Sequence, residues 1–195
     1  MMKKVLLMGD SIRMGYQSYV KEMLKHECEV IYWENDNGRF VQYSYWQLNQ
    51  MFKNYGPFDI VHFNNGYWDM NIEPPCEEPL NPIPEYVAGL IKIANYIKKQ
   101  KAIPIFANTL PIYSFGSSVD NSGTVASITY NNDWVIKYNK AAEEAMIRES
   151  ITINDMYSRM LTGPKYYKCP DMLHLTENGY KECAIVTAEV IRKYL

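Results

Sequence analysis

Histidine, cysteine and long apolar runs are all scarce in this sequence of 195 residues. It has four cysteines, and none of them forms a Cys-x-x-Cys pair or stands at zinc-ligand spacing from one of the three histidines. That excludes the common structural zinc patterns, and we expect four reduced thiols. No apolar run approaches the roughly 20 residues that a membrane-spanning helix needs, so no membrane partner is expected.

An excess of charge of one sign is also missing. The 20 basic and 22 acidic residues give a net charge of −2 without a basic run, which argues against nucleic-acid binding. Apolar residues make up 47% of the chain, as in folded proteins. At roughly 100–200 residues per domain, we expect one domain over residues 1–195. Lys3 and Lys4 precede only four apolar residues, fewer than the roughly 7–15 of a signal peptide. We therefore expect a cytoplasmic chain, and the earlier removal of an export signal stays open.

Short apolar runs alternate with amphipathic stretches along the chain. Strands are predicted at residues 5–8, 29–33, 59–64, 102–107 and 151–154, and helices at 15–25, 45–55, 86–99, 133–148 and 177–194. This alternation predicts a three-layer α/β/α sandwich built on a five-stranded parallel sheet. Ligands of such sheets bind at the carboxyl ends of the strands, so the loops that follow the strands are the candidate functional regions.

Two of these loops are long. Residues 70–84 hold five prolines, and residues 113–132 are rich in serine, glycine, asparagine and threonine. Loops of this length without secondary structure are uncommon and are often functional. Each is interpreted either as a lid or specificity element or as a plain surface loop.

His174 stands in such a loop, between the last predicted strand and the last helix. Asp171 precedes it by three residues, a spacing that places both side chains on one face of a turn. A carboxylate in that place fixes the tautomer of the imidazole and leaves Nε2 free as a base. The other histidines are expected to be structural: His62 as a hydrogen-bonded core residue and His26 as a solvated residue at a helix end.

Ser11 follows the first strand in Gly9-Asp10-Ser11, where the first helix opens. Its hydroxyl is a candidate nucleophile, and N–H groups at a helix start suit a developing oxyanion. The alternative is that Ser11 only caps the helix. Arg13 is expected to pair with Asp10 or Asp36 rather than to anchor an anionic substrate. The Gly-x-Ser-x-Gly elbow of the α/β hydrolases is absent.

Together, Gly9-Asp10-Ser11 and Asp171-x-x-His174 resemble the first and last sequence blocks of the SGNH (GDSL-like) hydrolases, which are flavodoxin-like α/β esterases and lipases. After the second strand, Gly38 resembles the glycine of the family's oxyanion hole. After the third strand, residues 64–69 match the family's Gly-x-Asn-Asp block in part. The blocks keep their order from residue 5 to the end, so the resemblance spans the chain.

Trp68 departs from this pattern, because the family has an asparagine there that donates to the oxyanion. Asn65 lies three residues upstream and is predicted to replace it as the donor. The indole N–H of Trp68 is the alternative donor. The departure also keeps open a weak or inactive protein that only binds carbohydrate.

The predicted function is that of a serine esterase acting on small acyl groups, with acylated sugars as candidate substrates. Ser11 attacks the ester, His174 accepts its proton and Asp171 orients His174. The N–H groups of Ser11 and Gly38, with Asn65, receive the oxyanion. This chemistry requires no metal and no organic cofactor. A flavodoxin-like nucleotide-binding or signalling domain is disfavoured, because the sequence has no glycine-rich phosphate loop.

Overall fold

A parallel sheet of five strands forms the centre of the protein. The computed structural model describes residues 2–113, 118–121, 124–127, 129–161, 164–168 and 173–195. The strands are β1 (Lys3–Leu7), β2 (Cys28–Tyr32), β3 (Ile60–Phe63), β4 (Ile103–Ala107) and β7 (Thr152–Asn154). They lie in the order β2-β1-β3-β4-β7, and all pairs are parallel. The predicted sheet is therefore confirmed.

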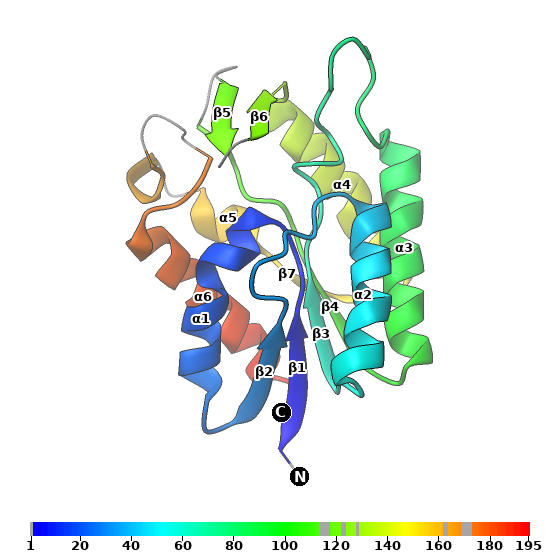
Figure 1. Ribbon diagram of the computed structural model, residues 1–195, viewed down its shortest axis with the longest axis vertical. Helices are drawn as coiled ribbons and strands as arrows, with labels where there is room; N and C mark the ends of the chain where they lie inside the picture. Colours follow the sequence, from blue (N-terminus) through cyan, green and yellow to red (C-terminus); the bar gives the residue numbers. More distant parts are fainter. Residues whose placement is uncertain (1, 114–117, 122–123, 128, 162–163, 169–172) are drawn as a thin grey trace.

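Helices cover both faces of this sheet (Figure 1). On one face lie α1 (Ser11–Leu24) and α6 (Glu177–Arg192), and on the other lie α2 (Val41–Tyr55), α3 (Ile83–Lys99) and α4 (Asn132–Arg148). Because helices cover both faces, a central strand has no solvent side, and every residue of β3 is buried. The three-layer α/β/α architecture is as predicted.

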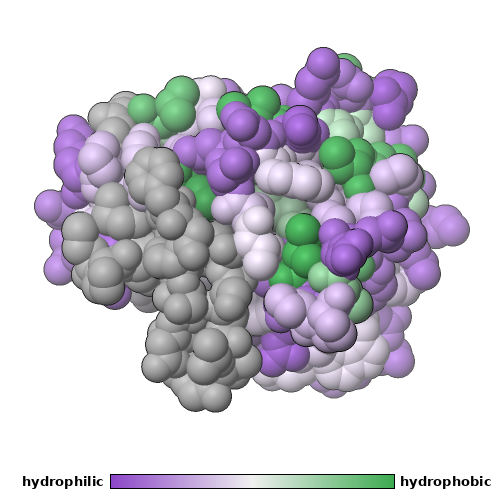
Figure 2. Space-filling model, turned by 90° about the horizontal axis from the view of Figure 1, so that it is seen from above, coloured by the Kyte–Doolittle hydropathy of each residue, from purple (hydrophilic) through white to green (hydrophobic). Residues whose placement is uncertain are grey.

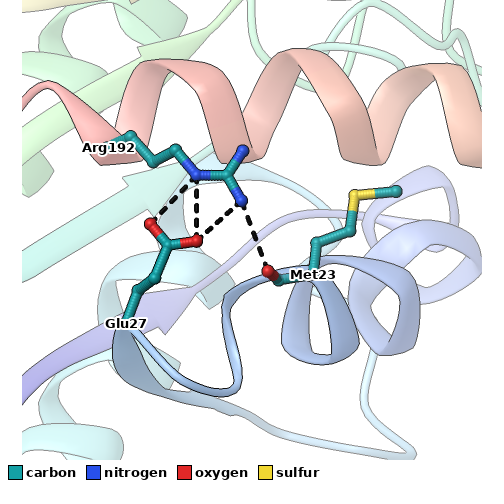
Figure 3. A network of polar contacts seen from close by, with 3 residues as sticks. All are labelled: Met23, Glu27 and Arg192. Atoms are coloured by element: carbon teal, nitrogen blue, oxygen red, sulfur yellow. Dashed lines mark hydrogen bonds and ion pairs between the residues drawn. The ribbon is translucent and has the colours of Figure 1, made fainter.

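Close packing joins α1, which begins at Ser11, to α6, which begins three residues after His174. A Cβ at Gly15 would lie 2.0 Å from the ring of Tyr180, so a larger residue there would displace that ring. At the other end of the pair, Arg192 Nη2 donates to a Glu27 carboxylate oxygen at 2.8 Å and to the Met23 carbonyl at 3.3 Å (Figure 3). The first and last helices are thus connected at both ends.

α1 and α2 begin four residues earlier than predicted, and in both cases an aspartate caps the start; α3 begins three residues earlier and α4 one residue earlier. Asp10 Oδ1 accepts a hydrogen bond from Ile12 N at 2.9 Å, so α1 begins at Ser11. Asp69, from the segment after β3, accepts one from Val41 N at 3.0 Å, so α2 begins at Val41. The second cap comes from a residue distant in the sequence, which a local pattern does not reveal.

The long loops contain more regular structure than expected. β5 (Ser118–Asn121) and β6 (Thr124–Ser127) form an antiparallel hairpin in the region predicted to lack secondary structure. The Thr129 hydroxyl and N–H both donate to Asn71 Oδ1, which joins this region to the proline-rich loop 70–84. Residues 155–176 include α5 (Met156–Met160) and a short 3₁₀ helix, Pro164–Tyr166.

The cysteines and His62 lie in different environments in the described part of the chain. Cys28, Cys76 and Cys183 are free thiols, and Cys169 lies outside the described residues. The described side chains contain no group of three that could hold a metal ion, and none of the described helices has the length and apolarity to cross a membrane. His62 is fully buried and lies 3.0 Å from Asn154 Nδ2, which confirms its role as a hydrogen-bonded core residue.

Candidate active site

Ser11 and His174 come together at the carboxyl end of β1, although 163 residues separate them. Ser11 Oγ lies 2.9 Å from His174 Nε2, and both side chains are partly exposed. His174 is held by its own main chain, whose carbonyl accepts from Lys168 N at 2.8 Å. The separation of Ser11 Oγ and His174 Nε2 is that of a hydrogen bond, and in this geometry a histidine can take a proton from a hydroxyl.

Asp10 explains why the hydroxyl of Ser11 is available. The helix start is capped by the Asp10 carboxylate, so the alternative in which Ser11 acts as the cap is wrong. Asp10 is fully buried; burial raises the pKa of its carboxyl, while the Ile12 N–H and the charges of His174 and Arg13 lower it. A buried carboxylate that faces a helix N-terminus thus stands directly before the candidate nucleophile.

Asp171, the predicted partner of His174, lies outside the described residues. Its role as the group that orients the imidazole therefore stays a prediction.

Gly38 brings the loop after β2 against the end of β1. Its N–H donates to the Gly9 carbonyl at 2.8 Å, and a Cβ at this position would lie 2.7 Å from the same oxygen. Only glycine allows this close approach. The expectation that its N–H is directed at an oxyanion is corrected, because that N–H already has an acceptor within the protein.

Asn65 is also used within the protein, which corrects its prediction as an oxyanion donor. The side chain is 1% exposed, and Nδ2 donates to the Arg39 carbonyl and to Ser44 Oγ, both at 2.8 Å. Both amide hydrogens therefore have acceptors. Asn65 connects the end of β3 to the start of α2 and does not face outward.

Trp68 stays the alternative oxyanion donor that the sequence left open. It is partly exposed, and no described residue accepts a hydrogen bond from its indole N–H. Its neighbour Asp69, by contrast, is fully buried and accepts from Val41 N and from Asn81 Nδ2. Burial raises the pKa of the Asp69 carboxyl to about 7.

Sequence reasoning missed the roles of Asp69 and Arg13. Asp69 caps α2. The only feature of the sequence that points to this role is an acidic residue shortly after the third strand. Arg13 does not make the expected ion pair in the described structure, because its guanidinium donates to main-chain carbonyls that include the one of Asp36. Neither role has a local signature.

Figure 2 views the molecule from above, looking onto the edge at which the strands end. In the described part of this face, hydrophobic residues form small patches that hydrophilic residues separate. No broad apolar surface is visible on that part.

No protein-family model and no curated protein sequence matches the chain. Solved structures do match it in shape. A GDSL-like lipase from Bacteroides thetaiotaomicron, 20% identical, superposes with a TM-score of 0.76 over 99% of this chain and 89% of its own. The aryl esterase of M. smegmatis, 12% identical, superposes with a TM-score of 0.76 over 99% of this chain and 100% of its own. A member of the lipolytic G-D-S-L family from Veillonella parvula, 15% identical, superposes with a TM-score of 0.71 over 98% of this chain and 99% of its own. Over nearly its whole length, then, the chain has the fold of the SGNH (GDSL-like) hydrolases.

Proposed function

We propose that the protein is a serine hydrolase that cleaves carboxylic esters. The observation that carries the proposal is the 2.9 Å separation of Ser11 Oγ and His174 Nε2 at the carboxyl edge of the sheet. The similar solved structures include an aryl esterase and a GDSL-like lipase, which supports ester chemistry for this fold.

The reaction proceeds in two halves. Ser11 Oγ attacks the acyl carbon as His174 Nε2 takes its proton, and His174 then gives that proton to the leaving alcohol. Water attacks the acyl-serine with His174 as the base, which releases the acid and restores the serine. Asp171 orients the imidazole and stabilises its charged form.

The oxyanion is received where α1 begins. No described residue accepts a hydrogen bond from Ser11 N, the first N–H of that helix, and the helix dipole favours negative charge there. Trp68 is the side-chain donor that we propose in place of the family's asparagine. Neither Gly38 N nor Asn65 Nδ2 is assigned this role, since both donate within the protein.

Short acyl groups are proposed as substrates in preference to long lipid chains. The described part of the face above the sheet has only small, separated apolar patches, whereas a long acyl chain needs a continuous apolar surface (Figure 2). We propose short-chain esters, including O-acetylated sugars, as the substrate class.

The proposal is tested by hydrolysis of p-nitrophenyl esters from acetate to laurate, with acetylated sugars alongside. Ser11→Ala should abolish most of the activity. Ser18→Ala is the matched control, because Ser18 lies exposed on the same helix and should leave the rate unchanged. Wild-type rates in Ser11→Ala would refute the mechanism.

The second candidate is a protein of the same fold that binds carbohydrate without cleaving it. The replacement of the family's asparagine by Trp68 favours this reading. A fluorophosphonate probe separates the two, because only an activated serine reacts with it. Labelling of wild type but not of Ser11→Ala supports the hydrolase; sugar binding without labelling supports the second candidate.

A further inference from the structure

Arg13 is a charged residue with almost no contact with solvent. It lies in the first turn of α1, two residues after Ser11, and is 1% exposed. Burying a guanidinium is costly unless hydrogen bonds replace its water. The partners of this side chain therefore indicate what the burial achieves.

Those partners are three main-chain carbonyls, in the loop after β2 and at Gly9 after β1, and one side-chain oxygen on α1. Nη1 donates to the Trp33 carbonyl at 3.0 Å and to the Gln17 side-chain oxygen. Nη2 donates to the Asp36 carbonyl at 2.5 Å and to the Gly9 carbonyl at 3.4 Å. No carboxylate oxygen accepts a hydrogen bond from Arg13 in the described chain, so its charge is directed at the main chain.

The Asp36 carboxylate is used elsewhere. Its Oδ2 accepts from the Tyr43 hydroxyl at 2.6 Å and from Gln47 Nε2 at 3.1 Å, both on α2. The loop 33–38 is thus attached to α2 through this side chain and to Arg13 through its carbonyls.

The Gly9 carbonyl is shared between Arg13 and the same loop. It accepts from Arg13 Nη2 and from Gly38 N, and Ser11 follows Gly9 by two residues. Arg13 and Gly38 therefore attach the loop 33–38 to the short segment that carries the nucleophile. Movement of this loop would change the surroundings of Ser11 directly.

A guanidinium suits this task better than an ammonium. It presents donors in a rigid planar fork. Here two of its nitrogens reach three carbonyls: those of Trp33 and Asp36 in one loop and that of Gly9, between β1 and α1. A lysine keeps the charge but has a single donor atom, so it cannot hold all three at once.

We propose that Arg13 is a positioning residue for the ester hydrolysis proposed above. It holds the loop 33–38 against the β1–α1 junction and so keeps the groups around Ser11 in their reactive arrangement. Arg13 is buried and does not touch substrate. Its loss should therefore lower kcat and leave KM nearly unchanged.

The first measurement compares kcat and KM of Arg13→Lys with those of wild type, using a short-chain p-nitrophenyl ester. We expect kcat to fall on the order of 10- to 100-fold, since a misplacement of about 1 Å near reacting groups has an effect of this size. KM should change by less than about threefold. Val20→Ala is the matched control, because Val20 is buried on the same helix and its side chain cannot donate a hydrogen bond to the loop. It should lower stability without lowering kcat.

The second measurement does not depend on activity. Hydrogen exchange at the Gly38 amide reports whether its bond to the Gly9 carbonyl persists, and the Asp59 amide, which donates to the Lys4 carbonyl at 2.8 Å, is the reference. Arg13→Lys should speed exchange at Gly38 at least about tenfold and leave Asp59 unchanged. Gln17→Leu removes one acceptor of the guanidinium and also the Gln17 donor to the Glu34 carbonyl of the same loop. It should give the same change at smaller size, which keeps the test available if Arg13→Lys folds poorly.

The outcomes are distinct. Faster exchange at Gly38 with a lower kcat and constant KM supports the positioning role. Unchanged exchange at Gly38, or faster exchange with an unchanged kcat, overturns it. A rise in KM at constant kcat also overturns it and would make Arg13 a substrate-binding residue. Failure of the proposed function has a different signature: wild type hydrolyses no ester and Ser11 does not react with a fluorophosphonate.

Discussion

The ends of β1 and β3 lie side by side in the sheet and differ in what they do with their polar groups. Both strands lead into a glycine with positive φ, 151° at Gly9 and 157° at Gly66. After β1, the hydroxyl of Ser11 is partly exposed and faces His174. After β3, Asn64 and Asn65 are buried, and their amides donate to interior oxygens.

The comparison shows that a polar residue at a strand end is not by itself a site residue. Its hydrogen-bonding groups must not be taken up by the main chain, and Ser11 Oγ instead meets the ring nitrogen of His174. At β1 a neighbour, Asp10, satisfies the helix start and leaves Ser11 for chemistry. At β3 the asparagines themselves satisfy main-chain carbonyls, so that strand end supports the fold.

The largest expected effect is at the β1 end. His174→Ala should lower kcat by about 10⁴-fold or more, because the serine then lacks its base. Combining it with Ser11→Ala should add little, since the two groups act as one unit. Initial rates on a p-nitrophenyl ester measure both variants. Independent, multiplicative losses would contradict a shared role.

The next effect is on stability at the β3 end. A Cβ at Gly66 would lie 2.1 Å from Thr109 Oγ1, in a backbone conformation that favours glycine. Gly66→Ala should lower the free energy of unfolding by about 3 kcal/mol, from overpacking and backbone strain together. Urea denaturation measures the loss. In a Thr109→Ala background the loss should be smaller, since the colliding oxygen is gone; an equal loss would show that the collision does not matter.

Asn65→Ala makes the comparison between the strand ends sharper. It leaves the Arg39 carbonyl and the Ser44 hydroxyl without their donor, so we expect a loss of about 1–3 kcal/mol in the free energy of unfolding. The kcat of the folded variant should stay much closer to wild type than that of His174→Ala. A fall of about 10²–10³ in kcat at unchanged stability would restore Asn65 as an oxyanion donor.

The last expected effect, the smallest per pH unit, is on how the free energy of unfolding around β3 depends on pH. Burial lowers the pKa of His62 to about 3, so the folded protein keeps it neutral while the unfolded chain protonates it below about 6.5. Stability from this residue is present above that value and is lost as the pH falls toward 3. Burial raises the pKa of Asp69 to about 7, so the folded protein keeps its proton while the unfolded chain releases it near 3.8. Stability from that residue is present at low pH and is lost as the pH rises toward 7.

Between about pH 4 and 6.5 these two contributions oppose each other, each by up to about 1.4 kcal/mol per pH unit. Asp69→Asn removes one of them and keeps an oxygen that can accept from Val41 N. Its free energy of unfolding should therefore rise with pH more steeply than that of wild type over this window. Urea denaturation at a series of pH values measures the two slopes, and parallel curves would show that Asp69 does not titrate with folding.

Much of the fold was predictable from the sequence because its signals are local. Short, largely apolar runs such as Ile60–Phe63 favour buried strands, and their alternation with amphipathic helices indicates a parallel sheet. The hairpin of β5 and β6 was missed, since a polar segment of short strands has no strong apolar period. The early starts of α1 and α2 were missed because they depend on the caps Asp10 and Asp69.

The sequence by itself determined the sheet, the place of its functional edge, and Ser11 and His174 as the candidate pair, because residue type and position along strands and helices carry that information. Only the tertiary structure decided which polar groups have partners inside. Asn65 donates to residues 26 and 21 positions before it, Gly38 donates to Gly9, and Arg13 donates to Trp33 and Asp36. Each of these bonds forms between segments that meet only when the sheet has assembled, so no local pattern in the sequence reveals it.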